Sequence, residues 1–143
     1  MKRTPLRRVS EKGATRAALH KLWRECLLAR DGERCAAQGW FNMRCGGPWQ
    51  GHHVWGQGAN PSLAMRYNLQ NGVILCAAHH KFGVHAASPI EVRAWLVHTV
   101  GEQRLANLEA LAHVSRRSRK RADPVATKLF LIQELKRLQG GKP

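Results

Sequence analysis

Residues 51–85 hold five of the chain's eight histidines, in a stretch that also contains one of its four cysteines. Two adjacent histidine pairs stand at 52–53 and 79–80, and His85 follows the second pair by five residues. Imidazole binds metal ions and titrates near neutral pH, so it serves both metal binding and proton transfer. The stretch therefore predicts that metal binding and catalysis organise this part of the fold.

The spacing of cysteine and histidine predicts a structural zinc site. Cys76 and His79 have two residues between them, the spacing with which one tight turn supplies two zinc ligands. Cys35 and Cys45 have nine residues between them, more than in a zinc-finger pair, and two small buried side chains are the alternative interpretation. Because residues 31–50 contain little apolar material, we expect a metal ion rather than a core to order them.

The adjacent pair His52-His53 indicates two separate roles. A short strand over residues 51–55 would place neighbouring side chains on opposite faces, so one metal ion cannot easily take both as ligands. A metal ion on one imidazole, with the other imidazole accepting a proton from a water molecule beside it, is a hydrolytic arrangement. Taken alone, an adjacent pair is more often two surface or core residues.

The chain is strongly basic, with 24 Lys and Arg residues against 9 acidic ones and a formal net charge of +15 over 143 residues. Such a surface binds polyanions, and counterion release makes nucleic acid the favoured partner. No apolar run approaches the roughly 18 residues of a membrane-spanning helix, and no apolar signal-peptide stretch follows the basic start. We therefore expect an intracellular, DNA-associated protein that does not bind membranes, with cysteines that are thiols or metal ligands.

Three basic segments are expected to contact phosphates without reading bases. They are an arm at 1–13, the run 116–121, and one face of the last helix that carries Lys128, Lys136 and Arg137. In the long loop after the histidine pair, Arg66 is either a phosphate clamp or a solvated residue. The predicted nucleic-acid-binding residues are Arg66, Lys2, Arg3, Arg7, Arg8, Arg116, Arg117, Arg119, Lys120 and Arg121.

The apolar pattern indicates an α+β fold with one compact domain and basic extensions. An N-terminal helix and two or three C-terminal helices are expected to flank its small core, which has a zinc-stabilised loop region. The first covers 15–30, with Cys26 on its buried side, and the second is capped by Ser88 and ends at Gly101. The third and fourth helices are defined by apolar residues at helical spacing. Their apolar sides consist of Leu105, Leu108 and Leu111 in the third, and of Val125, Leu129, Ile132 and Leu135 in the fourth.

Two strands are expected, at 51–55 and 72–76, on either side of the long loop. The predicted organisation is a basic flexible arm at 1–13, a domain at 14–115, and a basic linker with an amphipathic helix at 116–143. The remaining histidines lie on the expected helices and are interpreted as surface or packing residues. They are His20, His98 and His113.

Together these residues resemble the motif of HNH endonucleases, whose ββα-metal core consists of strand, loop, strand and helix. The family's histidine pair is matched by His52-His53, its Asn by Asn71 in "NGVILC", and its last His by His80. The resemblance covers residues 35–85. It implies that His53 is the general base, that His52 and His80 bind a divalent metal ion (Mg, Mn, Ni or Zn), and that Asn71 braces the loop and orients His53.

Two features depart from the family pattern. His79 stands where many members have a fourth zinc-binding cysteine, which zinc chemistry permits. The loop between the histidine pair and Asn71 is long, and Asn68 is an alternative bracing residue, although the spacing to Cys76 favours Asn71.

A third metal ligand is expected at His85, under one condition. Five residues separate His85 from His80, and on a straight α-helix that spacing places the two side chains off the same face. The expectation is therefore that His85 joins the metal site only if Gly83 breaks the helix.

The segment "HAASPIEVRAWL" and the opening "MKRTPLRR" bear a narrower similarity to phage-encoded HNH proteins that enhance recombination. It implies a setting in a bacterial host cytoplasm, with a recombinase filament as a possible partner. The DNA partner is expected in double-stranded, single-stranded or branched form. The predicted activity is metal-dependent hydrolysis of DNA phosphodiester bonds with low sequence specificity. Two alternatives stay open: a zinc-stabilised module that binds nucleic acid without cutting it, and an accessory factor that docks on a recombinase through residues 129–138.

Overall fold

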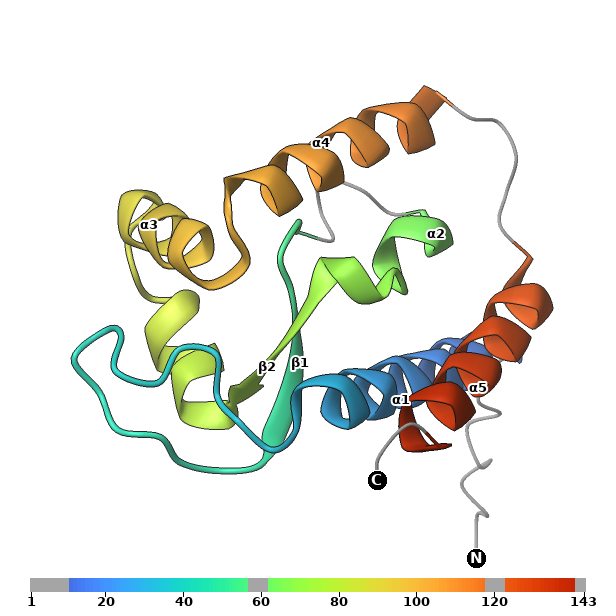
Figure 1. Ribbon diagram of the computed structural model, residues 1–143, viewed down its shortest axis with the longest axis horizontal. Coiled ribbons are helices and arrows are strands. Elements are labelled where there is room, and N and C mark those ends of the chain that lie inside the picture. Colours follow the sequence, from blue (N-terminus) through green and yellow to red (C-terminus); the bar gives the residue numbers. More distant parts are fainter. Residues whose placement is uncertain (1–10, 57–61, 118–122, 141–143) are drawn as a thin grey trace, which may run out of the picture.

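The computed structural model describes residues 11–56, 62–117 and 123–140, and it has an α+β fold that is mostly helical (Figure 1). The sheet has two strands. In chain order the elements are α1 (Glu11–Asp31), β1 (Trp49–His53), α2 (Leu63–Arg66), the 3₁₀ helix η1 (Leu69–Asn71), β2 (Gly72–Cys76), the π-helical segment η2 (His79–Val84), α3 (Pro89–Val100), α4 (Glu102–Arg117) and α5 (Pro124–Gly140).

The two strands pair antiparallel, in a register that sets His53 opposite Gly72 and Gly51 opposite Ile74. Both glycines face the ring of Trp23 in α1. A Cβ at Gly51 would lie 2.6 Å from that ring, and a Cβ at Gly72 would also overlap it. Because neither position carries a side chain, α1 can pack directly on the backbone of the sheet.

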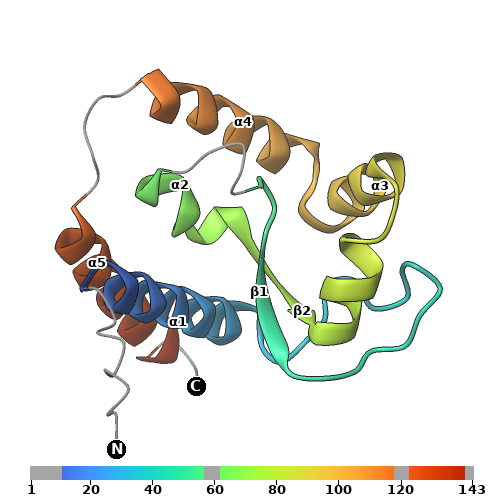
Figure 2. The same cartoon turned by 180° about the vertical axis from the view of Figure 1, so that it is seen from behind.

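A hydrophobic cluster lies on each face of the sheet, and β2 contributes to both because successive side chains point to opposite faces. Ile74 belongs to the cluster under α1 and α5, whereas Val73 and Leu75 belong to the cluster under α3 and α4. Figures 1 and 2 show α4 on one side of the strands and α1 with α5 on the other. All five residues of β2 are buried. The sheet is therefore the middle layer of the molecule.

The local helix signals are confirmed. Leu19, Trp23 and Cys26 on the expected side of α1 are all fully buried. At the start of α3, the Ser88 hydroxyl accepts from the Glu91 N–H at 3.3 Å, and the Glu91 carboxylate accepts from the Ser88 N–H at 3.0 Å. This reciprocal pair is a capping box, which satisfies two backbone donors that the helix itself leaves unbonded.

The expected apolar side of α5 is correct for Leu135 but wrong for Val125 and Leu129. Leu131 is fully buried, and the Sγ of Cys26 donates to its carbonyl oxygen at 3.3 Å, while Val125 is 63% exposed and Leu129 62% exposed. Because α5 carries apolar residues around most of its circumference, its sequence pattern permits more than one buried side. Packing against α1 selects the side with Leu131, Leu135 and Leu138.

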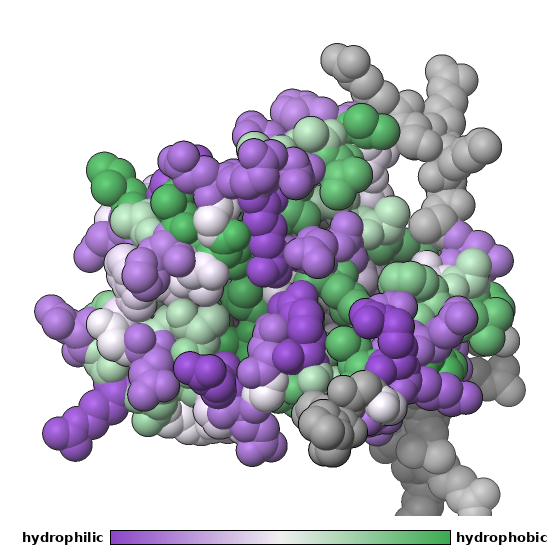
Figure 3. All heavy atoms as spheres, in the orientation of Figure 1, coloured by the Kyte–Doolittle hydropathy of each residue, from purple (hydrophilic) through white to green (hydrophobic). Residues whose placement is uncertain are grey.

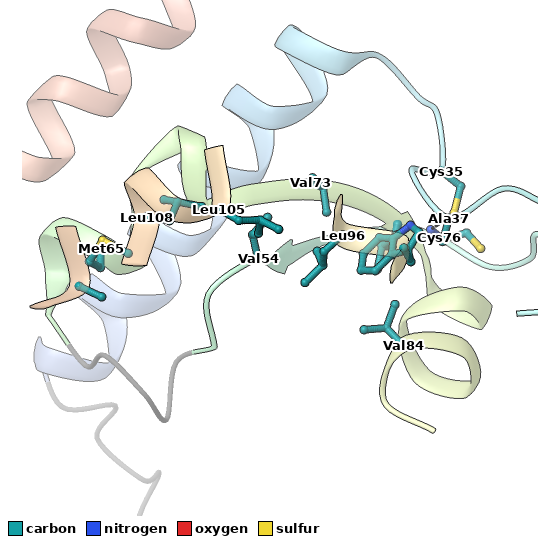
Figure 4. Packing of buried hydrophobic residues seen from close by; sticks show 13 residues of the cluster. Cys35, Ala37, Val54, Met65, Val73, Cys76, Val84, Leu96, Leu105 and Leu108 are labelled. Carbon is teal, nitrogen blue, oxygen red and sulfur yellow. Dashed lines mark hydrogen bonds between the residues drawn. The ribbon is translucent and has the colours of Figure 1, made fainter. Parts of the chain in front are cut away.

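Two further expectations differ from the structure. The helix α4 continues to Arg117, so the boundary placed between residues 115 and 116 falls inside it. The loop after α1 also has its own apolar contacts, because Cys35 and Ala37 are buried in the cluster under α3, as Figure 4 shows at one end of β2. In the described ranges, no helix has the length and apolar character needed to cross a membrane.

Candidate metal centre and active site

Cys35, Cys45, Cys76 and His79 come together although the chain separates them widely. Their ligand atoms all lie within 4.8 Å of one another. The Sγ of Cys76 is 3.1 Å and the Sγ of Cys45 is 3.6 Å from the Nδ1 of His79. These four residues, named here the cysteine cluster, could hold a metal ion, and three sulfurs with one imidazole nitrogen are a donor set compatible with structural zinc.

In the cysteine cluster, the side chains of His79 and Cys76 both favour the binding of a cation. The Nε2 of His79 lies 3.3 Å from the carbonyl oxygen of Trp40, which can only accept, so the proton is on Nε2 and Nδ1 has a lone pair toward the sulfurs. Burial by itself would raise the pKa of Cys76. The backbone N–H groups of His79 and Gly46, each 3.4 Å from its sulfur, outweigh burial and lower the pKa to about 6. Cys76 is thus poised as a thiolate.

His52, His80 and His85 form a second group, the histidine cluster, whose ligand atoms also lie within 4.8 Å of one another. The Nε2 atoms of His80 and His85 are 3.1 Å apart, and the ring of His52 lies 5.2 Å and 5.8 Å from theirs, centroid to centroid. Burial, followed by these two neighbouring imidazoles, lowers the pKa of His52 to about 3. The His52 ring is therefore neutral at physiological pH and keeps a lone pair for a cation.

The expectation that His85 joins this group only if Gly83 breaks the helix is wrong. The N–H of His85 donates to the carbonyl oxygen of His80 at 3.3 Å, an i to i+5 bond, so the helix widens into a π-helical turn without breaking. This turn brings residues five apart to one side. Gly83 has a different role, because a Cβ there would lie 3.1 Å from the ring of Phe41, which packs against the turn.

Gln50 is a positioning residue that the sequence did not reveal. Its Oε1 lies 2.5 Å from the Nδ1 of His80, and since Oε1 can only accept, the proton of His80 is on Nδ1. The Nε2 of His80 then has a lone pair toward His85 and His52. Alternation along β1 is the available signal, because Gln50 and His52 lie on the same side of the strand.

A Gln50→Leu variant is expected to bind a divalent metal ion at the histidine cluster about 10- to 100-fold more weakly, since metal-binding histidines depend on such outer hydrogen bonds. Gln50→Glu is the matched control, because a carboxylate keeps the acceptor and should preserve or improve the affinity. Isothermal titration calorimetry with Mn²⁺ or Ni²⁺ measures the metal affinity of both variants. The protein is first loaded with zinc in the cysteine cluster. Equal affinities in the two variants would contradict the assigned role of Gln50.

His53 lies on the opposite side of β1 from His52, with its ring stacked on Trp23 at 4.3 Å between centroids. Its Nε2 is 2.8 Å from the carbonyl oxygen of Arg66, so the neutral ring has its proton on Nε2 and its lone pair on Nδ1. The side chain is 8% exposed, and burial lowers its pKa to about 4 despite the bond to Arg66. His53 therefore has the protonation state that a general base requires.

Asn71 joins the two ends of the loop that follows β1. Its Oδ1 accepts from the Trp55 N–H at 2.6 Å, and its Nδ2 donates to the carbonyl oxygens of Met65 at 3.0 Å and Trp55 at 3.3 Å. Asn68 instead caps η1, where its Oδ1 accepts from the Gln70 N–H at 2.8 Å. Asn71 is thus the residue that braces this loop beside His53.

Basic side chains lie near His20 and His53, and the sequence revealed only one of them. The guanidinium Nε atoms of Arg66 and Arg24 are buried and have no hydrogen-bond partner in the described residues. The ring of His20 is stacked 6.3 Å from that of His53, and burial followed by Arg24 and Arg66 lowers its pKa. His20 is exposed and packs against the rings of Trp23 and His53, in agreement with its interpretation as a surface or packing residue, and with Arg24 and Arg66 it forms a basic group from one side of α1 and the loop.

Most of the other predicted phosphate contacts lie outside the described residues. These are Lys2, Arg3, Arg7, Arg8, Arg119, Lys120 and Arg121. Arg116 and Arg117 end α4, and their side chains are not described. Comparison of the chain with protein-family models, with curated proteins and with solved structures found no match.

Proposed function

We propose that this chain is a metal-dependent HNH endonuclease that hydrolyses DNA phosphodiester bonds with low sequence specificity, in phage DNA recombination or processing. The observation that carries the proposal is the histidine cluster of His52, His80 and His85, with a buried, neutral His53 next along the same strand. The order β1, loop, β2, η2 agrees with the strand, loop, strand and helix of the ββα-metal core. The cysteine cluster would hold structural zinc at the start of η2.

In this proposal His53 acts as general base. Its Nδ1 accepts a proton from water while the water oxygen attacks phosphorus. The bond from phosphorus to the 3′ oxygen then breaks, and the leaving oxygen takes a proton from solvent water, which leaves 3′-hydroxyl and 5′-phosphate ends. The carbonyl oxygen of Arg66 holds the ring in the required tautomer, and the stack on Trp23 fixes its plane. Asn71 holds the loop around His53 and so keeps the general base in place. Asn71 itself does not contact DNA in this mechanism.

The other side chains of the proposed site would stabilise negative charge on the phosphate group. A divalent ion held by His52, His80 and His85 would stabilise the negative charge that develops on the phosphate and on the leaving oxygen. Arg66, whose charge acts on His53, has a buried guanidinium Nε without a partner among the described residues, so an anion placed beside His53 would satisfy it. None of these contacts involves a base edge, which supports weak sequence preference.

Nicking of supercoiled plasmid tests the proposal directly. Purified full-length protein is incubated with Mg²⁺, Mn²⁺, Ni²⁺ or EDTA at low and moderate salt, and conversion to open circles is followed on gels. We expect nicking with at least one metal and none with EDTA. Protein that binds the plasmid but never cuts it with any metal would contradict the proposal and favour a binding module or a partner-dependent factor.

A further inference from the structure

A cleft of about 710 Å³ lies along the outer edge of β2, where the last turn of α1, the last turn of α3 and the first turn of α4 meet. Arg30, Arg34, Arg104 and Thr99 line it, and its lining contains one carboxylate, Asp31. No residue of the histidine cluster belongs to it. In the view of Figure 3, strongly hydrophilic side chains gather across the middle of the molecule between α4 and α1.

Two of the arginines are fixed to the main chain. Arg30 and Arg104 both donate through Nη2 to the carbonyl oxygen of Gly72, at 2.9 Å and 3.0 Å. Arg30 also donates to the carboxylate of Asp31 at 2.6 Å, whereas Arg104 donates only to carbonyl oxygens, those of Gln70 and Gly72. These bonds cover the outer edge of β2 at Gly72, beside Ile74, whose carbonyl oxygen accepts from the Ala36 N–H, and they hold both guanidinium groups in fixed positions.

The positive charge of the cleft exceeds the negative charge available to it. Arg34 is exposed and makes no ion pair with a described residue, and Arg104 has none either, so three guanidinium groups face the single carboxylate of Asp31. Burial, followed by the charge of Arg30, lowers the pKa of Arg104. An anion in the cleft would relieve this repulsion.

Thr99 provides an independent observation. Its hydroxyl oxygen is buried and has no hydrogen-bond partner within the described part of the chain, although Thr99 lines the cleft. A buried hydroxyl without a partner costs free energy, and a ligand oxygen can satisfy it. Rigid guanidinium groups together with a hydroxyl donor are the groups that recognise a phosphate.

We propose that this cleft binds a phosphate group of a nucleic-acid backbone, as a second contact separate from the histidine cluster. This inference rests on the proposed function, because DNA is taken as the source of the phosphate group. It does not require the chain to cleave DNA. Gly72, whose carbonyl oxygen holds Arg30 and Arg104, is paired with His53 across the sheet. A nucleic acid bound in the cleft beside β2 would therefore lie next to β1, which carries His53, the proposed general base.

The test compares two charge reversals in the full-length, zinc-loaded protein carrying His53→Ala, so that bound DNA is not cut. Arg34→Glu changes the cleft, and Arg93→Glu makes the same charge change at an exposed position of α3 outside it. Fluorescence anisotropy of a labelled 20-nucleotide strand and of its duplex gives affinities over a range of salt concentrations. We expect Arg34→Glu to bind at least about tenfold more weakly than Arg93→Glu, with a salt dependence smaller by about one phosphate contact.

Thr99→Val gives a second readout that does not involve charge. If the hydroxyl contacts the ligand, Thr99→Val weakens DNA binding. If the hydroxyl is only an unsatisfied buried group, the variant raises the thermal midpoint and leaves DNA affinity unchanged, which would count against the cleft.

Three outcomes test the proposal and distinguish the possible sources of the bound phosphate group. Equal DNA affinities for Arg34→Glu and Arg93→Glu would overturn the proposal. A thermal midpoint that inorganic phosphate raises in wild type but not in Arg34→Glu, together with those equal affinities, would assign the cleft to free phosphate and overturn the nucleic-acid source. Weaker binding by Arg34→Glu in a protein that never nicks plasmid would support the cleft while the proposed function fails.

Discussion

A His53→Ala variant is expected to nick supercoiled plasmid at least about 100-fold more slowly than wild type, at saturating metal and equal protein concentration. The substitution removes the only group that the proposed mechanism gives for deprotonating water. It leaves the ligands of the histidine cluster in place, since His80 is held by Gln50 and its Nε2 lies 3.1 Å from that of His85. The measurement is the initial rate of open-circle formation, together with the affinity for Mn²⁺ or Ni²⁺, which should stay within a few-fold of wild type.

The matched control is His113→Ala, an exposed histidine on α4 that belongs to neither cluster. It should nick at the wild-type rate. Because His53 is buried against Trp23, thermal unfolding of both variants shows whether the His53→Ala protein is folded at the assay temperature. A folded His53→Ala protein that nicks as fast as His113→Ala would show that another group acts as the base.

A Cys76→Ala variant is expected to lose most of the free energy of unfolding of the domain, along with one equivalent of bound zinc. Cys76 is 1% exposed, ends β2, and accepts the backbone N–H bonds of Gly46 and His79. A structural zinc site contributes about 10 kcal/mol in small zinc domains, which is comparable with the whole stability of a domain this size. Thermal unfolding by circular dichroism and metal analysis of the purified protein give both quantities.

Cys26→Ala separates the loss of a ligand from the loss of a buried thiol. Cys26 is also fully buried but lies in α1, away from the cysteine cluster. Its substitution should cost about 1–2 kcal/mol and leave the zinc content unchanged. A Cys76→Ala protein that behaves like Cys26→Ala in both measurements would mean that the cysteine cluster does not hold a structural metal ion.

Short-range patterns predicted much of the fold. The strand at residues 72–76 and the capped start of α3 are confirmed, because continuous apolar runs and capping residues act within a few positions. The buried side of α5 was predicted only in part, since Leu129 and Leu131 are equally apolar and only contact with α1 distinguishes them. Burial on a helix with apolar residues on several sides is a property of the tertiary structure.

In the candidate site too, local sequence features were predicted and tertiary contacts were not. The spacing of Cys76 and His79 predicted that pair, the resemblance to HNH endonucleases implied His80 as a metal ligand, and the two clusters contain these residues. The widened turn that brings His85 to His80 was not predicted, because an i to i+5 bond has no periodic signature in the sequence. Arg24 was missed for a related reason, since the sequence does not show that Arg24 and Arg66 both come near His20 once α1 packs against the sheet.

His79 and His80 are adjacent residues in η2, yet one belongs to the cysteine cluster and the other to the histidine cluster. A single peptide unit therefore links the two ions that the chain would carry. Zinc in the cysteine cluster would fix the start of η2 and thereby pre-organise His80 and His85 for the second ion. Such coupling is reciprocal, so each ion would tighten the binding of the other. For an organism carrying this protein, the supply of zinc would then set the level of DNA cleavage even when magnesium or manganese is abundant.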